Sequence, residues 1–385
     1  MSQLPPAHDP ASGASGQARF GAGDSADDSR TLSLALVGRS FVHPVFDYFL
    51  IGGALSLVVV CLVTVYPQLA PFSSAQDFKY FILFSNSAHF ASSTVRLYTK
   101  PGARGHQSFP FLKLGLPFLA LAVVTVCVFN EATIGKHFRS LYFTWSPYHY
   151  AAQAYGLTVM YCYRSGCLLG SANKKWLWWV AMIPSIFNFI TFPNAGIHWL
   201  DTAGWLRNPE AVAFVQNFRI IVPWIAFSAI GLLFWKIWRS ENRPMPLIGA
   251  LMLITNGVWW FIFPPMQAFV WATIFHGIQY LAIIVIFHVK DQMLRKDNRH
   301  GILFHALSFY GASLLLGFLL FDWFPRAYIL AGVAAGTSVM MTVAAINIHH
   351  FIVDSYIWRL KKSDSNRGIV DSTTNPAATP VPAPI

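Results

Sequence analysis

The sequence predicts an all-α polytopic membrane protein with about ten transmembrane helices and disordered N- and C-terminal tails. Three observations support this fold class. The 385 residues are 55% hydrophobic and only 11% charged, whereas soluble domains carry about 25% charged residues. The hydrophobic residues gather into runs of roughly 20, which is the length that a bilayer requires. Basic residues are concentrated in alternate loops between these runs, as the positive-inside rule expects.

Composition divides the chain into three regions. Residues 1–39 are polar and rich in Ser, Ala, Gly and Asp, which predicts a disordered cytoplasmic tail. Residues 40–360 contain the apolar runs and form the predicted ten-helix transmembrane domain. Residues 361–385 are rich in Pro, which predicts a second disordered cytoplasmic tail.

The apolar runs define the predicted spans in order along the chain. Gly and Pro separate several of them, and Pro264-Pro265 alone joins the seventh span to the eighth. These two spans should therefore form a tight antiparallel pair. The ten predicted spans are 41–66, 78–99, 110–130, 140–163, 176–195, 216–238, 245–263, 267–289, 301–321 and 327–357.

The basic residues test this count and predict the orientation. The loops on one side carry Arg96, Lys100, Arg104, Lys113, Arg164, Lys174, Lys175, Lys236, Arg239, Arg243, Lys290, Arg295, Lys296 and Arg299, with Arg359, Lys361, Lys362 and Arg367 after the last span. The opposite loops carry only Lys79, Lys136, Arg139, Arg207 and Arg326. Because one miscounted helix would invert the pattern downstream, its consistency predicts ten spans with both termini cytoplasmic. We expect Arg96 to extend its charge to the cytoplasmic surface.

The same distribution limits the expected partners. A net charge of +11 is compatible with nucleic-acid binding, but here the basic residues are dispersed through short loops. We therefore expect the lipid bilayer, with its anionic headgroups, as the partner of these charges and no nucleic acid. The expected location is the bacterial inner (cytoplasmic) membrane.

Histidines inside the predicted spans are the main indication of function. His89, His149, His276 and the pair His349-His350 lie in the second, fourth, eighth and tenth spans. The predicted topology makes these four spans run in the same direction. Because an ionisable side chain inside a bilayer is costly, each of these residues indicates a functional site.

Each of these histidines has a polar neighbour about one helical turn away. Metal-bound histidines usually donate their second ring nitrogen to such a neighbour. The predicted metal ligands are His89, His149, His276, His349, His350 and Asp354. The predicted outer hydrogen-bond partners are Asn86, Gln153, Gln279 and Asn347.

The depth of each histidine in the membrane follows from its distance to the basic flank of its span. At 1.5 Å per residue, His89 lies about 10 Å and His350 about 14 Å from that flank, and His276 and His149 about 21–22 Å. This spread predicts two layers, with His149 and His276 near the midplane and the other ligands nearer the cytoplasm. In each layer the imidazoles should face the bundle interior, with the odd-numbered helices further out.

These features favour a metal-dependent oxidoreductase that acts on an apolar lipid or isoprenoid small molecule. Imidazole and carboxylate ligands suit iron, and also copper or zinc. A haem or pigment protein with axial histidines is one alternative. Another is a proton-coupled transporter in which His and Asp act as a relay, although the sequence shows no internal repeat. A structural scaffold without chemistry is a further alternative.

Short motifs do not narrow this choice. The sequence contains no P-loop, no GxSxG and no GxGxxG after a strand. The fragment Asn347-Ile348-His349-His350 resembles part of the last histidine box of the membrane desaturases. The first histidine of that box is missing, so the fragment does not place the chain in that family.

Overall fold

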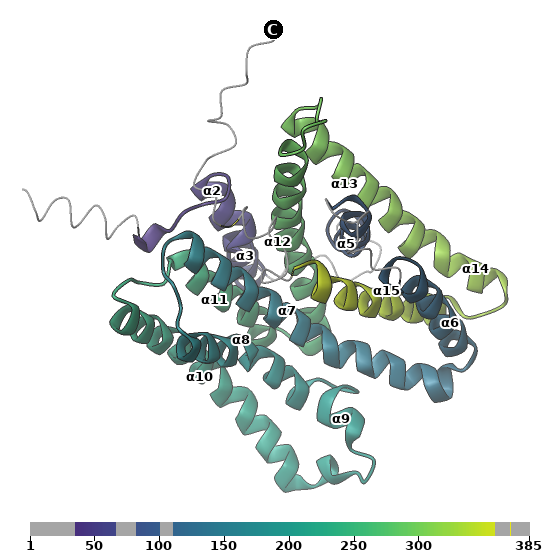
Figure 1. Cartoon of the computed structure of the whole chain (residues 1–385). Helices are drawn as coiled ribbons and strands as arrows, with labels where there is room; N and C mark the ends of the chain where they lie inside the picture. The colour runs from purple at the N-terminus through teal and green to yellow at the C-terminus, as the bar shows by residue number, and fades with distance from the viewer. Residues whose placement is uncertain (1–34, 67–81, 101–110, 359–369, 371–385) are drawn as a thin grey trace, which may run out of the picture.

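The computed structural model of the protein describes residues 35–66, 82–100, 111–358 and 370. These residues form helices, turns and loops and no β-strand, which confirms the all-α fold class (Figure 1). Most of the two tails predicted to be disordered lies outside the described residues.

The described elements follow one another as helices joined by short connections. The α-helices are α2 (Pro44–Phe46), α3 (Ala54–Val65), α5 (Ala88–Thr99), α6 (Leu116–Phe129), α7 (Lys136–Arg164), α8 (Ser171–Thr191), α9 (Gly196–Leu200), α10 (Pro209–Glu241), α11 (Leu247–Ile262), α12 (Pro265–Met293), α13 (Ile302–Phe318), α14 (Phe324–Leu330) and α15 (Ala335–Ile357). The wider π-helical segments are η1 (Asp47–Ile51), η3 (Ile82–Ser87), η4 (Phe111–Gly115), η5 (Glu131–Gly135) and η7 (Leu319–Trp323), and η6 (Trp205–Arg207) is a 3₁₀ turn.

Several of these helices are long and apolar enough to cross a membrane, which indicates an integral multi-pass membrane protein. In the described part of the chain six stretches meet this condition: Phe111–Phe129, Ser171–Leu200, Pro209–Glu241, Pro265–Met293, Ile302–Leu330 and Ala335–Ile357. A seventh is formed if Pro44–Ile51 and Ala54–Val65, bent by 53°, make one broken span. The bend falls at Gly53, whose φ of +84° favours glycine.

Every one of the ten predicted spans overlaps a helical segment, but four of these segments, the bent pair among them, do not meet the condition on their own. The segment 82–99 and Lys136–Arg164 carry many polar residues, and Leu247–Ile262 is a shorter apolar helix. The predicted boundary near residues 322–326 is wrong, because α13, η7 and α14 continue as one helical stretch to Leu330. The chain breaks instead before α15, where Gly332 has a φ of +89°.

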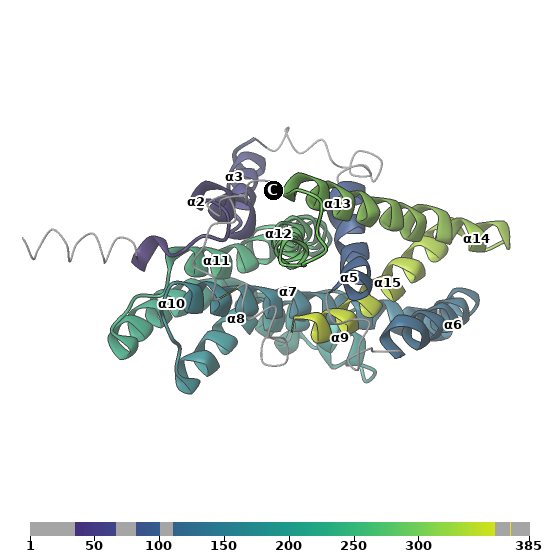
Figure 2. The ribbon, with the colours of Figure 1, turned by 45° about the horizontal axis from the view of Figure 1, so that its top comes forward.

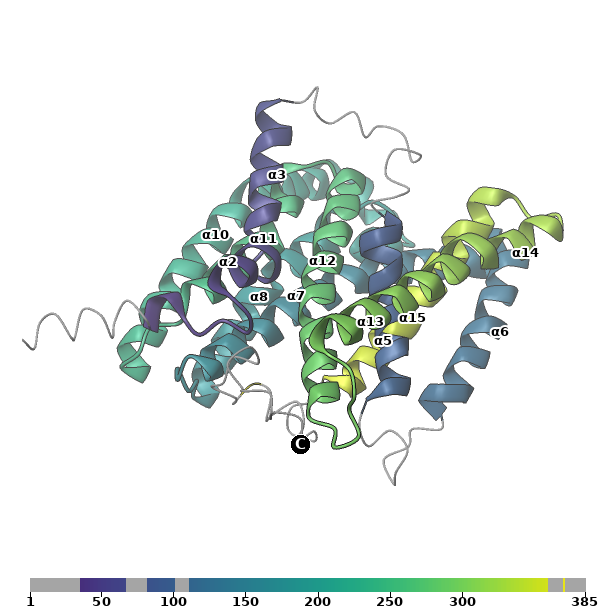
Figure 3. The ribbon, with the colours of Figure 1, turned by 90° about the horizontal axis from the view of Figure 1, so that it is seen from above.

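Helix α12 passes through the middle of the bundle, with other helices on several sides. In Figure 2 it is seen nearly end-on, with α5, α7, α11 and α13 around it. Helix α5 packs against α12, α13 and α15, and α15 also packs against α7. Figure 3 shows α6 on one edge of the bundle and α3 and α10 on the opposite side.

Burial separates the inner helices from the outer ones. The apolar stretches of α12 and α15 are 67% and 61% buried, whereas those of α6 and α10 are 28% buried. The expectation that the odd-numbered helices lie further out is wrong for the seventh, α11. Its buried residues include Met252, Thr255 and Trp259, because it packs between α7, α8, α10 and α12.

Two glycines let neighbouring helices approach the segment that precedes His89. A Cβ added at Gly277 on α12 would lie 3.2 Å from the carbonyl oxygen of Ser85. A Cβ at Gly317 on α13 would lie only 2.7 Å from the backbone of Ser87. The absence of a side chain at these positions therefore brings α12 and α13 against η3 and the start of α5.

The expectation that Arg96 reaches the cytoplasmic surface is wrong. Arg96 is completely buried on α5, and its Nη2 lies 2.8 Å from Oδ2 of Asp291 on α12. The guanidinium also stacks near the rings of Phe287 and Trp358. A buried acidic partner on another helix, which the predicted span boundaries could not reveal, holds the charge inside the bundle.

Candidate metal centre

Four histidines from four helices meet in the interior of the protein. They are His89 on α5, His149 on α7, His276 on α12 and His350 on α15, and one nitrogen from each lies within 4.8 Å of the others. This group is called the histidine cluster below. Four nitrogens bound at about 2.1 Å to one tetrahedral ion are roughly 3.4 Å apart. Movements of about 1 Å would therefore bring the cluster to a metal-binding geometry, so it could hold one metal ion.

The rings pack edge to face around a common centre. The ring of His89 lies 4.4 Å from that of His350 and 4.8 Å from that of His276, measured between centroids. The ring of His149 lies 5.1 Å from each of the same two histidines. The cluster is thus closed on all four sides, and the aromatic rings of Phe90, Tyr150, Tyr280 and Phe351 pack against it.

This geometry corrects the expected separation into two layers. His89, assigned to the cytoplasmic layer, is in contact with His276, assigned to the midplane layer. The depths assumed straight helices with basic flanks in one plane. The buried Arg96 breaks that assumption on α5, since its guanidinium does not reach the surface.

Local irregularities precede two of the cluster histidines. The π-helical segment η3 ends at Ser87, two residues before His89. Pro147 lies inside α7, two residues before His149, and a proline within a helix removes one backbone hydrogen bond and bends the axis. Segments of these kinds are common at functional sites because they aim a side chain away from its regular direction.

The cluster nitrogens lack other hydrogen-bond partners. Within the described residues, Nε2 of His149, His276 and His350 and both ring nitrogens of His89 are buried and accept or donate no hydrogen bond. Four such groups at one point are unusual, because a buried polar atom without a partner is unfavourable by about 1–3 kcal/mol. A bound cation would satisfy them together.

The hydroxyl of Ser93 contacts the ring of His350. It lies 2.8 Å from Nδ1 of His350 and 3.1 Å from the carbonyl oxygen of Phe90, to which it can donate. When the hydroxyl donates to Phe90 and Nδ1 of His350 donates to Ser93, Nε2 of His350 is unprotonated, as a metal ligand has to be.

Asp354 lies at the edge of the cluster and is held by an aromatic pair. Its Oδ2 is 3.4 Å from Nε2 of His350 and 3.9 Å from Nε2 of His149. Tyr280 donates to the other oxygen, Oδ1, at 2.5 Å, and Trp358 donates to the hydroxyl of Tyr280 at 3.2 Å. These two hydrogen bonds leave the other carboxylate oxygen, Oδ2, directed at the histidines.

The remaining predicted site residues lie around this core. His349 is next to the cluster in sequence but is not one of its four members. Gln153 donates to Gln279 at 2.9 Å, and Gln279 donates to the carbonyl of Ile51. The Nδ2 of Asn347 donates to the carbonyl of Val343. Asn86 is buried, with an Oδ1 that has no hydrogen-bond partner in the described residues.

Ser93 and Tyr280 were not among the predicted site residues, although they bond to His350 and Asp354. A sequence pattern exists for Ser93, because Asn86, His89 and Ser93 follow one another at intervals of three and four residues, the spacing of one helix face. Tyr280 follows Gln279 on α12 and reaches a different helix, so spacing along the chain gives no indication of its partner.

An apolar cavity adjoins the cluster on the side of His149 and Asp354. It has a volume of about 450 Å³, within the range of pockets that bind small molecules. The cavity follows one face of α7 from Trp145 to Met160 and one face of α15 from Phe351 to Trp358, with Tyr280 and Ile283 of α12 as its floor. His149 and Asp354 thus belong both to the centre and to the cavity wall.

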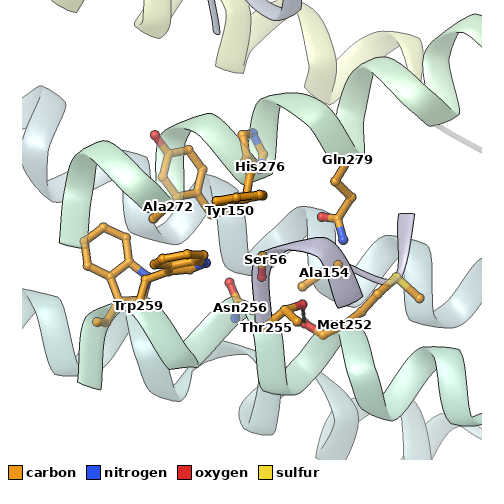
Figure 4. A pocket seen from close by; sticks show the side chains of 13 residues that line it. Ser56, Tyr150, Ala154, Met252, Thr255, Asn256, Trp259, Ala272, His276 and Gln279 are labelled. Atoms are coloured by element: carbon orange, nitrogen blue, oxygen red, sulfur yellow. Dashed lines mark hydrogen bonds between the residues drawn. The ribbon is translucent and has the colours of Figure 1, made fainter. Parts of the chain in front are cut away.

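A second, much smaller cavity lies on the side of His276. Its volume is about 40 Å³, enough for at least one water molecule, which needs roughly 10–15 Å³. Figure 4 shows His276, Tyr150 and Gln279 along one side of it, facing Ser56, Thr255 and Asn256. The centre therefore lies between a water-sized space, lined in part by Ser56, Thr255 and Asn256, and a larger apolar cavity.

Comparisons with known proteins find no relative of this chain. No protein-family model, no curated protein and no solved structure matches it.

Proposed function

We propose that the histidine cluster binds one metal ion, with iron favoured, and that the protein is a membrane-embedded oxidoreductase acting on an apolar lipid or isoprenoid. The observation that carries the proposal is the convergence of four buried imidazole nitrogens without hydrogen-bond partners on one point. Imidazole with a nearby carboxylate suits iron as well as copper and zinc. Iron bound there would supply redox chemistry beside the apolar cavity.

The protein's own residues orient the ion and its surroundings. Ser93 would accept a hydrogen bond from Nδ1 of His350 when Nε2 binds the ion. Tyr280 and Trp358 hold Asp354 with one oxygen toward His350 and His149, where it offsets positive charge in the apolar interior. The cluster nitrogens, all within 4.8 Å, occupy the space in which the four nitrogens of a porphyrin would lie. This crowding supports a single ion over the haem alternative.

Metal analysis of the detergent-purified protein tests the proposal. We expect about one iron ion per chain, bound through imidazole, and no Soret absorption band. The protein should be purified without a histidine tag, since a tag would itself bind metal. A Soret band would replace the proposal with the haem alternative. Protein that holds no transition metal, even after incubation with Fe²⁺ under reducing conditions, would refute a metal centre.

We further propose that all ten helical segments cross the bacterial inner membrane, with residues 1–39 and 361–385 as cytoplasmic tails. The alternation of basic and neutral loops supports this arrangement. Single cysteines at Lys175→Cys and Thr202→Cys, in a background without native cysteines, test it in intact cells. An impermeant maleimide should label the Thr202 position and leave the Lys175 position unlabelled until the cells are opened. The reverse pattern would contradict the topology.

A further inference from the structure

The apolar cavity between α7 and α15 opens on the outer surface of the bundle. Two of its lining residues, Tyr148 on α7 and Ser355 on α15, are exposed. The lining from Trp145 to Met160 extends about 22 Å along α7 at 1.5 Å per residue. Tyr148 lies near the middle of α7, whereas Ser355 lies in the last turn of α15. The opening beside Tyr148 therefore faces the lipid phase if α7 crosses the membrane.

The chemistry of the lining selects against charged ligands. None of the fourteen lining residues is Lys or Arg, and five are Trp, Tyr or Phe. The carboxyl group of Asp354 is the only acidic group among them. A carboxylate or phosphate headgroup would find no cationic side chain there and would lie beside Asp354, which also offsets the charge of a bound metal. A neutral molecule needs no cationic partner and is not repelled by Asp354.

We propose that this cavity binds a neutral, apolar lipid that enters sideways from the bilayer between α7 and α15 and places its reactive end beside His149 and Asp354. The inference rests on the proposed function for the reaction but not for the binding. The aromatic walls supply a large apolar contact area to such a molecule. The lining runs from Trp145 to Met160 on α7 and from Phe351 of α15 to Trp358 just after it, so the molecule would lie along the groove between these two segments.

Gly156 offers a way to close the cavity without disturbing the fold. It lines the cavity on α7, and a Cβ added there would meet no atom within 4 Å. Gly231 on α10 is a matched control, since a Cβ there also meets nothing within 4 Å and the residue is exposed outside the cavity. Phenylalanine at position 156 would fill the groove, whereas phenylalanine at position 231 would face the lipid.

Photolabelling in lipid nanodiscs tests the inference with two probes that differ only in charge. The probes are hexadecanol and hexadecanoic acid, each with a diazirine at the middle of the chain, and the adducts are mapped by mass spectrometry. We expect hexadecanol to label residues 145–160 and 351–358 at least about tenfold more than hexadecanoic acid. Gly156→Phe should reduce this labelling about tenfold, while Gly231→Phe should leave it unchanged.

The outcomes separate this inference from the proposed function. Equal labelling of Gly156→Phe and wild type, or equal labelling by the two probes with and without a chelator, would overturn the inference. Bound metal without specific labelling would overturn it while leaving the metal centre in place. Specific labelling of a protein that binds no metal would support the lipid site and contradict the metal centre. Metal content and the size-exclusion profile of Gly156→Phe report whether the variant is folded.

Discussion

Helix α12 and the stretch from α13 through α14 are consecutive, equally long and similarly apolar, yet their surroundings are opposite. Each stretch has 29 residues, and 67% of the apolar window is buried in α12 against 22% in Ile302–Leu330. Apolar character cannot separate them, because lipid and protein interior are both apolar. The polar residues separate them, since lipid cannot satisfy a hydrogen bond and a neighbouring helix can.

The polar residues of the two stretches show this difference directly. Thr273, His276 and Tyr280 of α12 are buried and contact side chains on α5, α7 or α15. In the second stretch, Asp322 of η7 pairs with Arg326 one turn further along, at 2.8 Å. Tyr310 and Tyr328 of the second stretch also reach other elements. The contrast therefore lies in the acidic and histidine side chains, since those of α12 contact other helices whereas Asp322 pairs within its own stretch.

The acidic residues offer the largest contrast between the two stretches. Asp291 of α12 pairs with Arg96, with both side chains 1% exposed, whereas the side chains of Arg326 and Asp322 are 54% and 22% exposed. Asp291→Asn should lower the free energy of unfolding by about 3–5 kcal/mol, because it leaves a buried charge without its partner. Asp322→Asn should lower it by less than about 0.5 kcal/mol.

The two free energies of unfolding can be measured by titrating each variant with denaturing detergent and monitoring the loss of helix by circular dichroism. A small loss for both variants would mean that water or lipid headgroups reach Arg96 and that α12 is not an interior helix at this end.

A histidine on each stretch gives the second, smaller contrast. His276 of α12 belongs to the cluster, whereas His305 of α13 is partly exposed and lies 2.8 Å from Asn298. His276→Ala should reduce bound metal by about 10-fold or more, the scale on which metal sites respond to loss of an ordering group. His305→Ala should leave the metal content unchanged.

Elemental analysis of both variants at matched protein concentration measures the difference. Equal metal content in the two variants would mean that the histidine cluster does not bind the metal. The relay or scaffold alternatives would then replace the proposed metal centre.

The sequence predicted the centre better than it predicted the architecture. His89, His149, His276 and His350 could be identified because an ionisable residue in an apolar run has few explanations. Their meeting at one point could not be derived from depth along straight helices, since it depends on η3, on Pro147 and on the close approach at Gly277. The Arg96–Asp291 pair was also not predicted, because the sequence analysis placed Arg96 at the cytoplasmic surface and counted only basic residues.

The separation of the cluster along the chain has a consequence for biosynthesis. Ser93 and His350 are in contact although they are 257 residues apart. At a translation rate of 5–20 residues per second, α15 is made roughly 13–50 s after α5. During that interval the imidazoles of α5, α7 and α12 lack the partner that α15 supplies. The ribosome has therefore passed α15 before the cluster can close, and a metal that needs all four histidines would be acquired after synthesis of these helices and not during it.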